Sequence, residues 1–381
     1  MEQVLPQLPA VVAAYAAGLE SMNEGLKVAG SALSSWSADP EGCDARIRAA
    51  MTGSSQPYAV SLLEPPGAVV PAPPFTPVTV VAADGSSIEP DRFAPVQCYV
   101  VNVGFAVLPY GTAHEAALGA HCTVGPPAPE SEGEEDAGME DSGPRAWGVN
   151  LLRDVVELET GARLAEESAA GGPTVLLLDG TLLPWDLDSR QVADSTRREL
   201  VGRTRLALDR LASCPGRTGV GAYVSGSRSS DVVNSLRALA AADGMAWPGS
   251  DGHLFATRLR DGERSAVFRA ASERVRRVEE FFAGQHDVCF FYLRIGGDIA
   301  RVELPRWATT AEQVARLHAT LVDQCHRCDG YPRALQEAHE QAVISGGDRQ
   351  AFSRALEAEA SSHGLRAATN SKQMSKRRRG L

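Results

Sequence analysis

Residues 174 to 178 form a short apolar run, TVLLL, that ends at Asp179 and Gly180. A strand in which polar and apolar residues do not alternate is typical of the interior of a sheet that has helices on both faces. Three strands before it predict an antiparallel meander, and alternating helices and strands follow it along the chain. These patterns predict an α/β fold in which helices flank a mixed sheet.

Charge is unevenly distributed along the chain. The net charge of −11 over 381 residues argues against a nucleic-acid partner when it is taken alone. Residues 130 to 141 hold seven acids and no base, and leaving them out changes the net charge from −11 to −4. Residues 371 to 381 hold five bases and no acid. Local patches therefore indicate more about the partner than the net charge does.

We expect a reduced, cytoplasmic protein that does not bind a membrane. The seven cysteines are spread over a long chain, the N-terminus has no basic and apolar leader, and no apolar run reaches the ~20 residues of a membrane span. An apolar fraction of 44% and a charged fraction of 22% are those of a globular chain, so a packed core is expected.

Composition and periodicity divide the chain into four parts. Residues 1–52 are expected to be an N-terminal helical segment, because apolar residues recur there at three- and four-residue spacing. Residues 53–76 are rich in Pro, Gly and Ser and are interpreted as a linker. Residues 77–345 are expected to form the main domain, with a disordered acidic insertion at 126–144. Residues 346–381 are predicted to form a C-terminal helix and a basic tail.

Two predicted strands end in Asp-Gly. The run from Val78 to Ala83 leads to Asp84, and the run from 174 to 178 leads to Asp179. A buried strand delivers its last side chain to the sheet edge, where ligands gather. Clustered carboxylates supply the oxygen ligands that hard divalent cations prefer, and two such cations about 4 Å apart can hydrolyse a phosphodiester. Because Asp-Gly is also ordinary turn chemistry, either motif carries little weight alone.

The second motif has two competing interpretations. Leu-Asp-Gly-Thr resembles the phosphatase motif Asp-x-Asp-Gly-Thr of the haloacid dehalogenases, but the position of their nucleophilic aspartate is Leu177 here. That chemistry therefore cannot start from this strand. Sugar-kinase-like phosphotransferases also use Asp-Gly-Thr turns, yet the chain has no Gly-rich phosphate loop.

The C-terminal half adds a series of blocks in a specific order. They are Phe290 to Arg294, Ile299 to Trp307, Gly330-Tyr331-Pro332 with Leu335, Ala338-His339, and Ser371-Lys372 with the basic run from Lys376 to Arg379. Together with the two Asp-Gly strand ends, these blocks resemble the NurA family of DNA-repair nucleases. The resemblance covers roughly residues 75 to 380.

The resemblance implies an RNase H-like core at residues 77–345, a ring-like homodimer and dependence on Mn²⁺ or Mg²⁺. It also implies 5′→3′ exonuclease and single-strand endonuclease activity on DNA. The implied partner is a hexameric HerA-type ATPase, which feeds DNA to the nuclease during end resection and double-strand break repair.

Individual residues follow from the resemblance. Asp84 and Asp179 match the family's metal aspartates. The residues alone leave Glu157 and Glu159 as candidates for a third carboxylate, and the pattern Arg153-x-x-x-Glu157 favours Glu157. His339 lies where family members have a histidine near the metal.

The strand that ends near Val224 departs from the family pattern. A lysine- or arginine-rich turn is usual there, whereas this chain has Ser225-Gly226-Ser227-Arg228. Arg228 is therefore the candidate for neutralising a phosphate. The expected DNA contacts are Arg228, Arg301, Lys372, Lys376 and Arg377, since clustered Lys and Arg attract the phosphate backbone.

This altered turn also supports an alternative, in which the chain is a catalytically weakened adaptor ring on a DNA translocase. A phosphotransferase of the broader RNase H-like group is a third hypothesis, which the missing phosphate loop disfavours.

Overall fold

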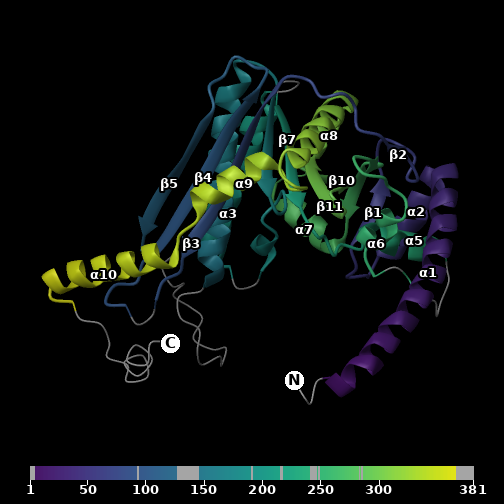
Figure 1. Ribbon diagram of the computed structural model, residues 1–381, viewed down its shortest axis with the longest axis horizontal. Coiled ribbons are helices and arrows are strands. Elements are labelled where there is room, and N and C mark those ends of the chain that lie inside the picture. The colour runs from purple at the N-terminus through teal and green to yellow at the C-terminus, as the bar shows by residue number, and fades with distance from the viewer. Residues whose placement is uncertain are drawn as a thin grey trace.

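The apolar run at residues 174 to 178 lies in the middle of the sheet in the computed structural model of this chain (Figure 1). It forms strand β6, Thr174–Asp179, whose first five residues are all buried. Neighbouring strands flank it on both sides and helices cover it above and below, so no face of this strand is left for polar side chains. Because both faces of the strand are buried, its sequence does not alternate between polar and apolar residues.

The structure describes residues 5–365, except for 92–93, 127–145, 190–191, 215–217, 241–246, 248, 283 and 285. The strands are β1 Tyr58–Ser61, β2 Val69–Val70, β3 Val78–Ile88, β4 Tyr99–Tyr110, β5 Ala117–Gly125, β6, β7 Thr218–Val224, β8 Arg264–Ser265, β9 Phe268–Ala271, β10 Val288–Ile295 and β11 Asp298–Pro305. The α-helices are α1 Leu8–Ala38, α2 Pro40–Met51, α3 Ala146–Ala169, α4 Asp194–Ala212, α5 Asp231–Ala240, α6 Asp251–Ala256, α7 Glu273–Phe281, α8 Ala311–His326, α9 Arg333–Ala342 and α10 Gly346–Ser362. Short 3-10 helices occupy Leu5–Gln7, Trp185–Asp188 and Arg306–Ala308.

These strands form one mixed sheet in the order β1-β9-β10-β11-β7-β6-β3-β4-β5, with β8 paired to β10 and β2 paired to β8. The pairs β3–β6 and β6–β7 are parallel, and the other pairs are antiparallel. The meander expected from the sequence is β3–β4–β5. The parallel centre brings the carboxyl ends of β3, β6 and β7 toward the same edge of the sheet.

Side chains of successive strand residues enter two separate cores. Val80 and Leu177 belong to the core beneath α8 and α9, whereas Val81 and Leu176 belong to the core beneath α3, α4 and α5. In Figure 1, α8 and α9 lie in front of the sheet and α3 lies behind it. This alternation also sets which face each site residue meets, because side chains that are two residues apart share a face.

The structure corrects the interpretation of residues 53–76 as a linker. Tyr58, Ala59 and Val60 are buried in β1, which pairs with β9, and β2 pairs with β8. The Ser235 hydroxyl accepts the N–H of Ala59 at 2.9 Å and donates to its carbonyl oxygen at 2.8 Å. Two short parts of this stretch, β1 and β2, therefore belong to the sheet, and the apolar residues of β1 complete the core beside α5.

β3 is also longer than the sequence indicates. The pattern predicts a strand that stops at Asp84, whereas β3 continues to Ile88. It does so because β4 pairs with it along its whole length, up to Ile88↔Val100. Asp84 therefore lies inside a strand, although its parallel neighbour β6 ends at the same level.

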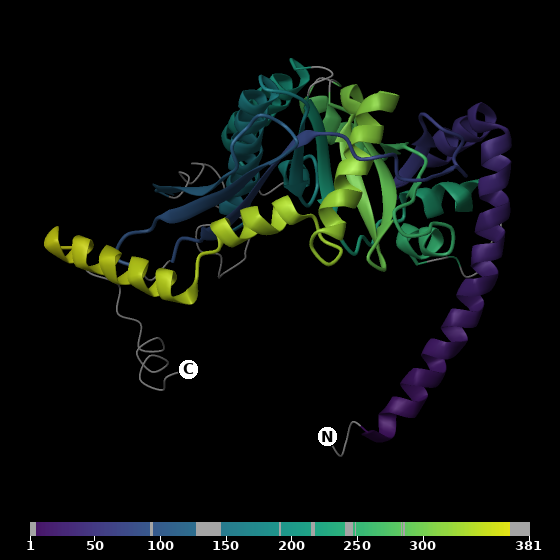
Figure 2. The same cartoon turned by 45° about the horizontal axis from the view of Figure 1, so that its top comes forward.

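Helix α1 has a buried half and an exposed half. Ala29, Leu33 and Trp36 are fully buried against the main core, while Val12 and Tyr15 are 64% and 69% exposed. Figures 1 and 2 both show the N-terminal half of α1 extending away from the sheet. The segment 1–52 is thus joined to the main core through the second half of α1 and through α2.

The expected acidic insertion at 126–144 and the basic tail fall almost wholly outside the described residues. In the part of the chain that the structure describes, no helix combines the length and apolar character needed to cross a membrane.

Replacing Trp36 with Ala should destabilise the fold by about 3–5 kcal/mol, since the change leaves a large cavity. Trp36 packs on Phe268 with ring centroids 5.7 Å apart, and its indole N–H donates to Asp44 at 2.8 Å. Urea unfolding measures the loss. Val12→Ala, on the exposed half of the same helix, is the control and should change stability by less than about 0.5 kcal/mol. Equal effects would contradict the division of α1.

Candidate functional site

Asp84 and Asp179 lie side by side because their strands are parallel neighbours. β3 and β6 pair in register up to Ala83↔Leu178, so the next residue of each strand is one of the two aspartates. Residues in register on neighbouring strands point to the same face of a sheet. Both carboxylates therefore lie on the face that α9 covers. The side chain of Asp84 is 13% exposed. Asp179 is solvent-accessible at the end of β6, although the protein groups packed around its carboxylate remove part of its hydration.

Glu157 approaches the two aspartates from α3, on the opposite face. Its Oε1 lies 3.1 Å from Nε of Arg153, and its side chain is 12% exposed. Gly85 permits this approach, because a Cβ at that position would lie 2.4 Å from Glu157 Oε1. On the side of β6, β3 has no neighbouring strand at this level, since β6 ends at Asp179, whereas β4 continues on its other side. The carboxylate of Glu157 therefore reaches the space at the open end of β6.

Glu159, the other candidate for a third carboxylate, is directed away from the site. Two residues along a helix correspond to a rotation of about 200°. Glu159 accepts two hydrogen bonds from Arg203 of α4, at 2.8 and 2.7 Å. The structure therefore brings Glu157, and not Glu159, to the aspartates.

His339 contacts Asp84 across the face of the sheet. Its Nδ1 donates to Asp84 Oδ2 at 2.6 Å, and the ring is 65% exposed. α9 lies directly on β4 because Gly104, which pairs with Asp84, has no side chain. A Cβ on Gly104 would lie 2.3 Å from the carbonyl oxygen of Ala338. The amide of Asn102 fixes the end of α9 by donating to the carbonyl oxygen of Ala342 at 2.9 Å.

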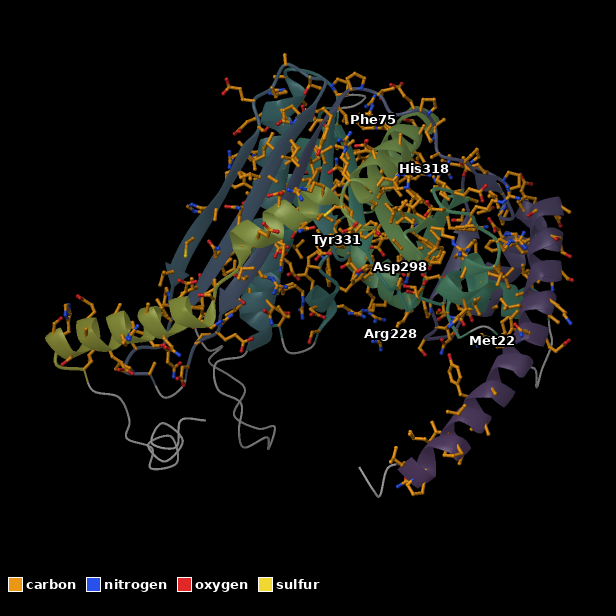
Figure 3. All side chains as sticks on the ribbon, viewed as in Figure 1. Met22, Phe75, Arg228, Asp298, His318 and Tyr331 are labelled. Carbon is orange, nitrogen blue, oxygen red and sulfur yellow. The ribbon has the colours of Figure 1, made fainter. Side chains whose placement is uncertain are left out.

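Tyr331 is a site residue that the sequence did not identify. Its hydroxyl donates a hydrogen bond to the carboxylate of Asp179, and its ring meets Tyr223 edge-on with centroids 5.8 Å apart. Figure 3 shows it on the loop between α8 and α9, where Asp329 and Gly330 have φ of 46° and 98°. The block Gly330-Tyr331-Pro332 contributed to the family resemblance, and this pattern was the available signal.

Arg153, the partner of Glu157, also received no role from the sequence.

The three carboxylates carry more negative charge than their partners neutralise. Burial raises the pKa of Glu157 well above 4.5, and the charges of Asp154, Asp84 and Asp179 raise it further, while Arg153 opposes the rise. The pKa of Asp179 is raised by burial and then by Asp84, against the hydrogen bond from Tyr331. Like charges at short range disfavour ionisation, so a cation placed among these groups would relieve the repulsion.

This donor set fits a hard divalent cation. Carboxylate oxygens from three chain segments converge on one sheet edge, and oxygen is the ligand that Mn²⁺ and Mg²⁺ favour. Among the described residues, no group of three or more His, Cys, Asp or Glu side chains is already arranged to hold a metal ion. Two of the carboxylates are instead bound by protein groups, Asp84 by His339 and Glu157 by Arg153.

The expected basic residues do not all join this site. Arg228 is exposed in the turn after β7, at the same edge of the sheet as Asp179, and makes no ion pair with the three described carboxylates (Figure 3). Arg301 is only 5% exposed and is paired with Asp231 at 3.2 Å. The expectation that Arg301 contacts DNA is therefore wrong, because a buried and paired guanidinium cannot reach a phosphate. Lys372, Lys376 and Arg377 lie outside the described residues.

Comparison with known proteins gives one family. The NurA domain model matches residues 78–344. The fold is similar to the crystal structure of the NurA nuclease from Sulfolobus solfataricus, with 16% identity and a TM-score of 0.51 over 78% of this chain and 87% of that one. That likeness confirms the predicted mixed sheet flanked by helices.

More distant matches are a structure of NurA with manganese, at 11% identity and a TM-score of 0.39 over 78% of this chain and 91% of that one, and LC9-RNase H1. LC9-RNase H1 has 13% identity and a TM-score of 0.22 over 49% of this chain and 86% of that one. No curated protein matches this chain.

Glu157→Gln should stabilise the protein in EDTA at pH 7. The folded state holds the proton of Glu157 more tightly than the unfolded chain, since its pKa is raised well above 4.5. The free energy of unfolding of the wild type therefore falls as pH rises above 4.5, and this contribution disappears in the variant. Thermal unfolding between pH 4.5 and 8 measures it. Glu159→Gln, which loses a salt bridge instead, should not stabilise; a lower Tm for Glu157→Gln would contradict the argument.

Gly104→Ala should destabilise the protein by about 1–3 kcal/mol and separate His339 from Asp84. The new Cβ would meet backbone atoms of Ala338 and Ala342 at 2.3 and 2.4 Å, so α9 must move. Gly202→Ala in α4 is the matched control: nothing lies within 4 Å of its Cβ, and it should stabilise by about 0.5–1 kcal/mol. Urea unfolding compares the two, and a neutral Gly104→Ala would show that α9 does not need this close contact.

Proposed function

Because this chain belongs to the NurA family, we propose that it is a divalent-metal-dependent nuclease that hydrolyses DNA. The observation that supports this activity best is the in-register pair Asp84 and Asp179, with Glu157 beside it. Burial, and then the charges of neighbouring acids, raise the pKa of Glu157 and Asp179, so the three carboxylates form a site that favours a cation. The site lies at the carboxyl end of parallel strands, where ligands of α/β proteins bind.

Asp84, Asp179 and Glu157 are the residues that we propose would hold Mn²⁺ or Mg²⁺. The bound cation would activate water and stabilise the leaving oxygen in phosphodiester hydrolysis. Tyr331 holds Asp179 in place by its hydrogen bond, and His339 does the same for Asp84. His339 is also exposed enough to meet a phosphate oxygen as a hydrogen-bond donor.

Arg228 is our candidate for the phosphate contact outside the carboxylate cluster. It extends from the turn after β7, next to β6 in the sheet, so its long side chain is available at the same edge as Asp179. A guanidinium can bind two phosphate oxygens at once, which suits it to this position. The basic residues Lys372, Lys376 and Arg377 would add contacts to the DNA backbone that do not depend on base sequence.

The specific activities and partners that we propose are inferred from membership of the NurA family. We propose 5′→3′ exonuclease and single-strand endonuclease activity, a homodimer, and a hexameric HerA-type ATPase that supplies DNA for end resection and double-strand break repair. The alternative is an adaptor ring on a translocase in which cleavage is weakened, and its support is the position of Arg228 outside contact with the carboxylates.

A cleavage assay tests the proposal. Wild-type protein is incubated with end-labelled linear and single-stranded DNA in Mn²⁺, Mg²⁺ or EDTA, with and without the ATPase. Cleavage should require the metal, and Asp84→Asn and Asp179→Asn should each lower the rate by more than about 100-fold, since even residues that only support metal ligands change activity by 10–100-fold. Glu159→Gln should cleave like the wild type.

Two outcomes would overturn parts of this proposal. If wild-type protein cleaves no DNA even with the ATPase, the adaptor alternative is correct. If Asp84→Asn cleaves as fast as the wild type, the site has been placed wrongly.

A further inference from the structure

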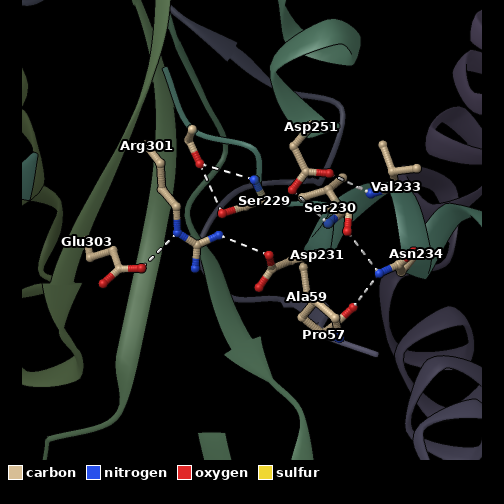
Figure 4. Close-up of polar contacts among 12 residues, drawn as sticks. Pro57, Ala59, Ser229, Ser230, Asp231, Val233, Asn234, Asp251, Arg301 and Glu303 are labelled. Carbon is tan, nitrogen blue, oxygen red and sulfur yellow. Dashed lines mark hydrogen bonds and ion pairs between the residues drawn. The ribbon is translucent and has the colours of Figure 1, made fainter. Parts of the chain in front are cut away.

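Arg301 of β11 lies at the centre of a buried network of charged groups (Figure 4). Its Nε donates to Glu303 at 2.8 Å, and its guanidinium pairs with Asp231 at 3.2 Å and lies 3.7 Å above the ring centroid of Phe290. Arg301, Glu303 and Asp231 are 5%, 3% and 6% exposed. Removing such charges from water is costly unless every one is paired, so the network holds its members in one arrangement.

Glu303 connects this network to the segment that follows β6, the strand that carries Asp179. Its Oε2 accepts the backbone N–H of Leu182 at 3.0 Å, and Leu182 is 2% exposed. In the sheet, β7 lies between β11 and β6, and the register places Glu303 opposite Ala222, the neighbour of Tyr223, which pairs with Asp179. Glu303 therefore reaches across β7 to fix the chain three residues after Asp179.

The same strand holds both ends of the turn that carries Arg228. At the start of the turn, Asp298 of β11 accepts the N–H of Gly226 at 3.0 Å. At its end, Arg301 pairs with Asp231, the first residue of α5. Asp251 strengthens this second anchor by accepting the N–H groups of the two residues after Asp231, at 3.0 and 2.8 Å.

We propose that β11 is the positioning strand of the site: Glu303 sets the position of Asp179 through Leu182, and Arg301 and Asp298 set the position of Arg228. None of the three is among the residues that we propose to hold the metal or the phosphate. This inference rests on the proposed function for the roles of Asp179 and Arg228. It also gives Arg301 a structural role in place of the expected DNA contact, which its burial excludes.

A second pair in the same sheet provides a matched control. Glu64 accepts from Arg264 at 2.6 Å and from the backbone N–H of Val267 at 3.0 Å, so it combines an arginine and an amide as Glu303 does. It joins the segment between β1 and β2 to β8 and to Val267, which precedes β9, and β10, β11 and β7 separate these strands from β6. Loss of this pair should therefore lower stability without moving the site.

The test compares Glu303→Gln with Glu64→Gln in three measurements. In EDTA, hydrogen exchange at the Leu182 amide should be at least about 10-fold faster in Glu303→Gln only. Calorimetric titration with Mn²⁺ should show about 10- to 100-fold weaker binding in Glu303→Gln, as loss of a supporting hydrogen bond typically produces. The kcat on DNA should fall by a similar factor while KM stays within about 3-fold, and Glu64→Gln should keep wild-type values of all three.

Asp298→Ala, at a hairpin turn, tests the second anchor if Glu303→Gln does not fold. It should raise KM for DNA, and its effect should be absent in an Arg228→Ala background, because the two act as one unit. The inference would be overturned if Glu303→Gln left both the hydrogen exchange of the Leu182 amide and the Mn²⁺ affinity unchanged, or if Glu64→Gln caused equal losses. Additive effects of Asp298→Ala and Arg228→Ala on KM would also overturn it. If wild-type protein cleaves no DNA, the proposed function fails, while hydrogen exchange and Mn²⁺ binding still decide on the positioning role of Glu303.

Discussion

The parallel pairing of β3 with β6 is the constraint on which the site depends. It places Asp84 and Asp179 on one face, one residue beyond the last paired positions. Two carboxylates at this spacing repel each other, so the surrounding chain must supply compensating groups. His339 donates to Asp84, and Tyr331 donates to Asp179. These groups come from the helical layer on one face and from the loop that leads to it, so the site forms only when that layer is packed.

Close packing of helices on both faces requires two positions without side chains. Gly85 leaves space for Glu157 on the α3 face, and Gly104 leaves space for the backbone of α9 on the other. The two glycines lie on adjacent strands at the level of Asp84, which pairs with Gly104. Three catalytic candidates from opposite faces can therefore meet near one sheet edge. A side chain at either glycine would move a helix, and with it a candidate ligand or its partner.

The charged residues of β11 and α5 that we propose to support the site are buried. Arg301, Glu303 and Asp231 are removed from solvent, whereas Asp179 and His339 remain accessible. Buried ion pairs contribute little to net stability, but a fully paired network restricts the positions of the groups that it connects. The proposed cation site, whose ligands repel one another, would gain from such a fixed support. The burial of Arg301 is therefore better explained by position than by contact with DNA.

Much of the fold was predictable from local patterns. The apolar run of β6 indicated a central strand, because burial on both faces leaves no room for polar alternation. The aspartates at 84 and 179 followed from strand ends and from the family blocks downstream. Residues 53–76 were misinterpreted, since the density of proline and glycine concealed a strand, Tyr58–Ser61, whose partner β9 lies about 200 residues later in the chain.

Sequence patterns alone thus predicted a mixed sheet with helices, the two strands that carry the aspartates and the family, although Asp84 lies inside β3 and not at its end. The three-dimensional packing showed that Glu159 is bound by Arg203, away from the aspartates. It also identified Tyr331 as the partner of Asp179 and Arg153 as the partner of Glu157, and it showed that Arg301 is buried. The physical reason is the same in each case. Strand and helix patterns depend on neighbours within a few residues, whereas the role of a charged side chain depends on the groups packed against it, such as the amide of Leu182 beside Glu303, 121 residues away in the chain.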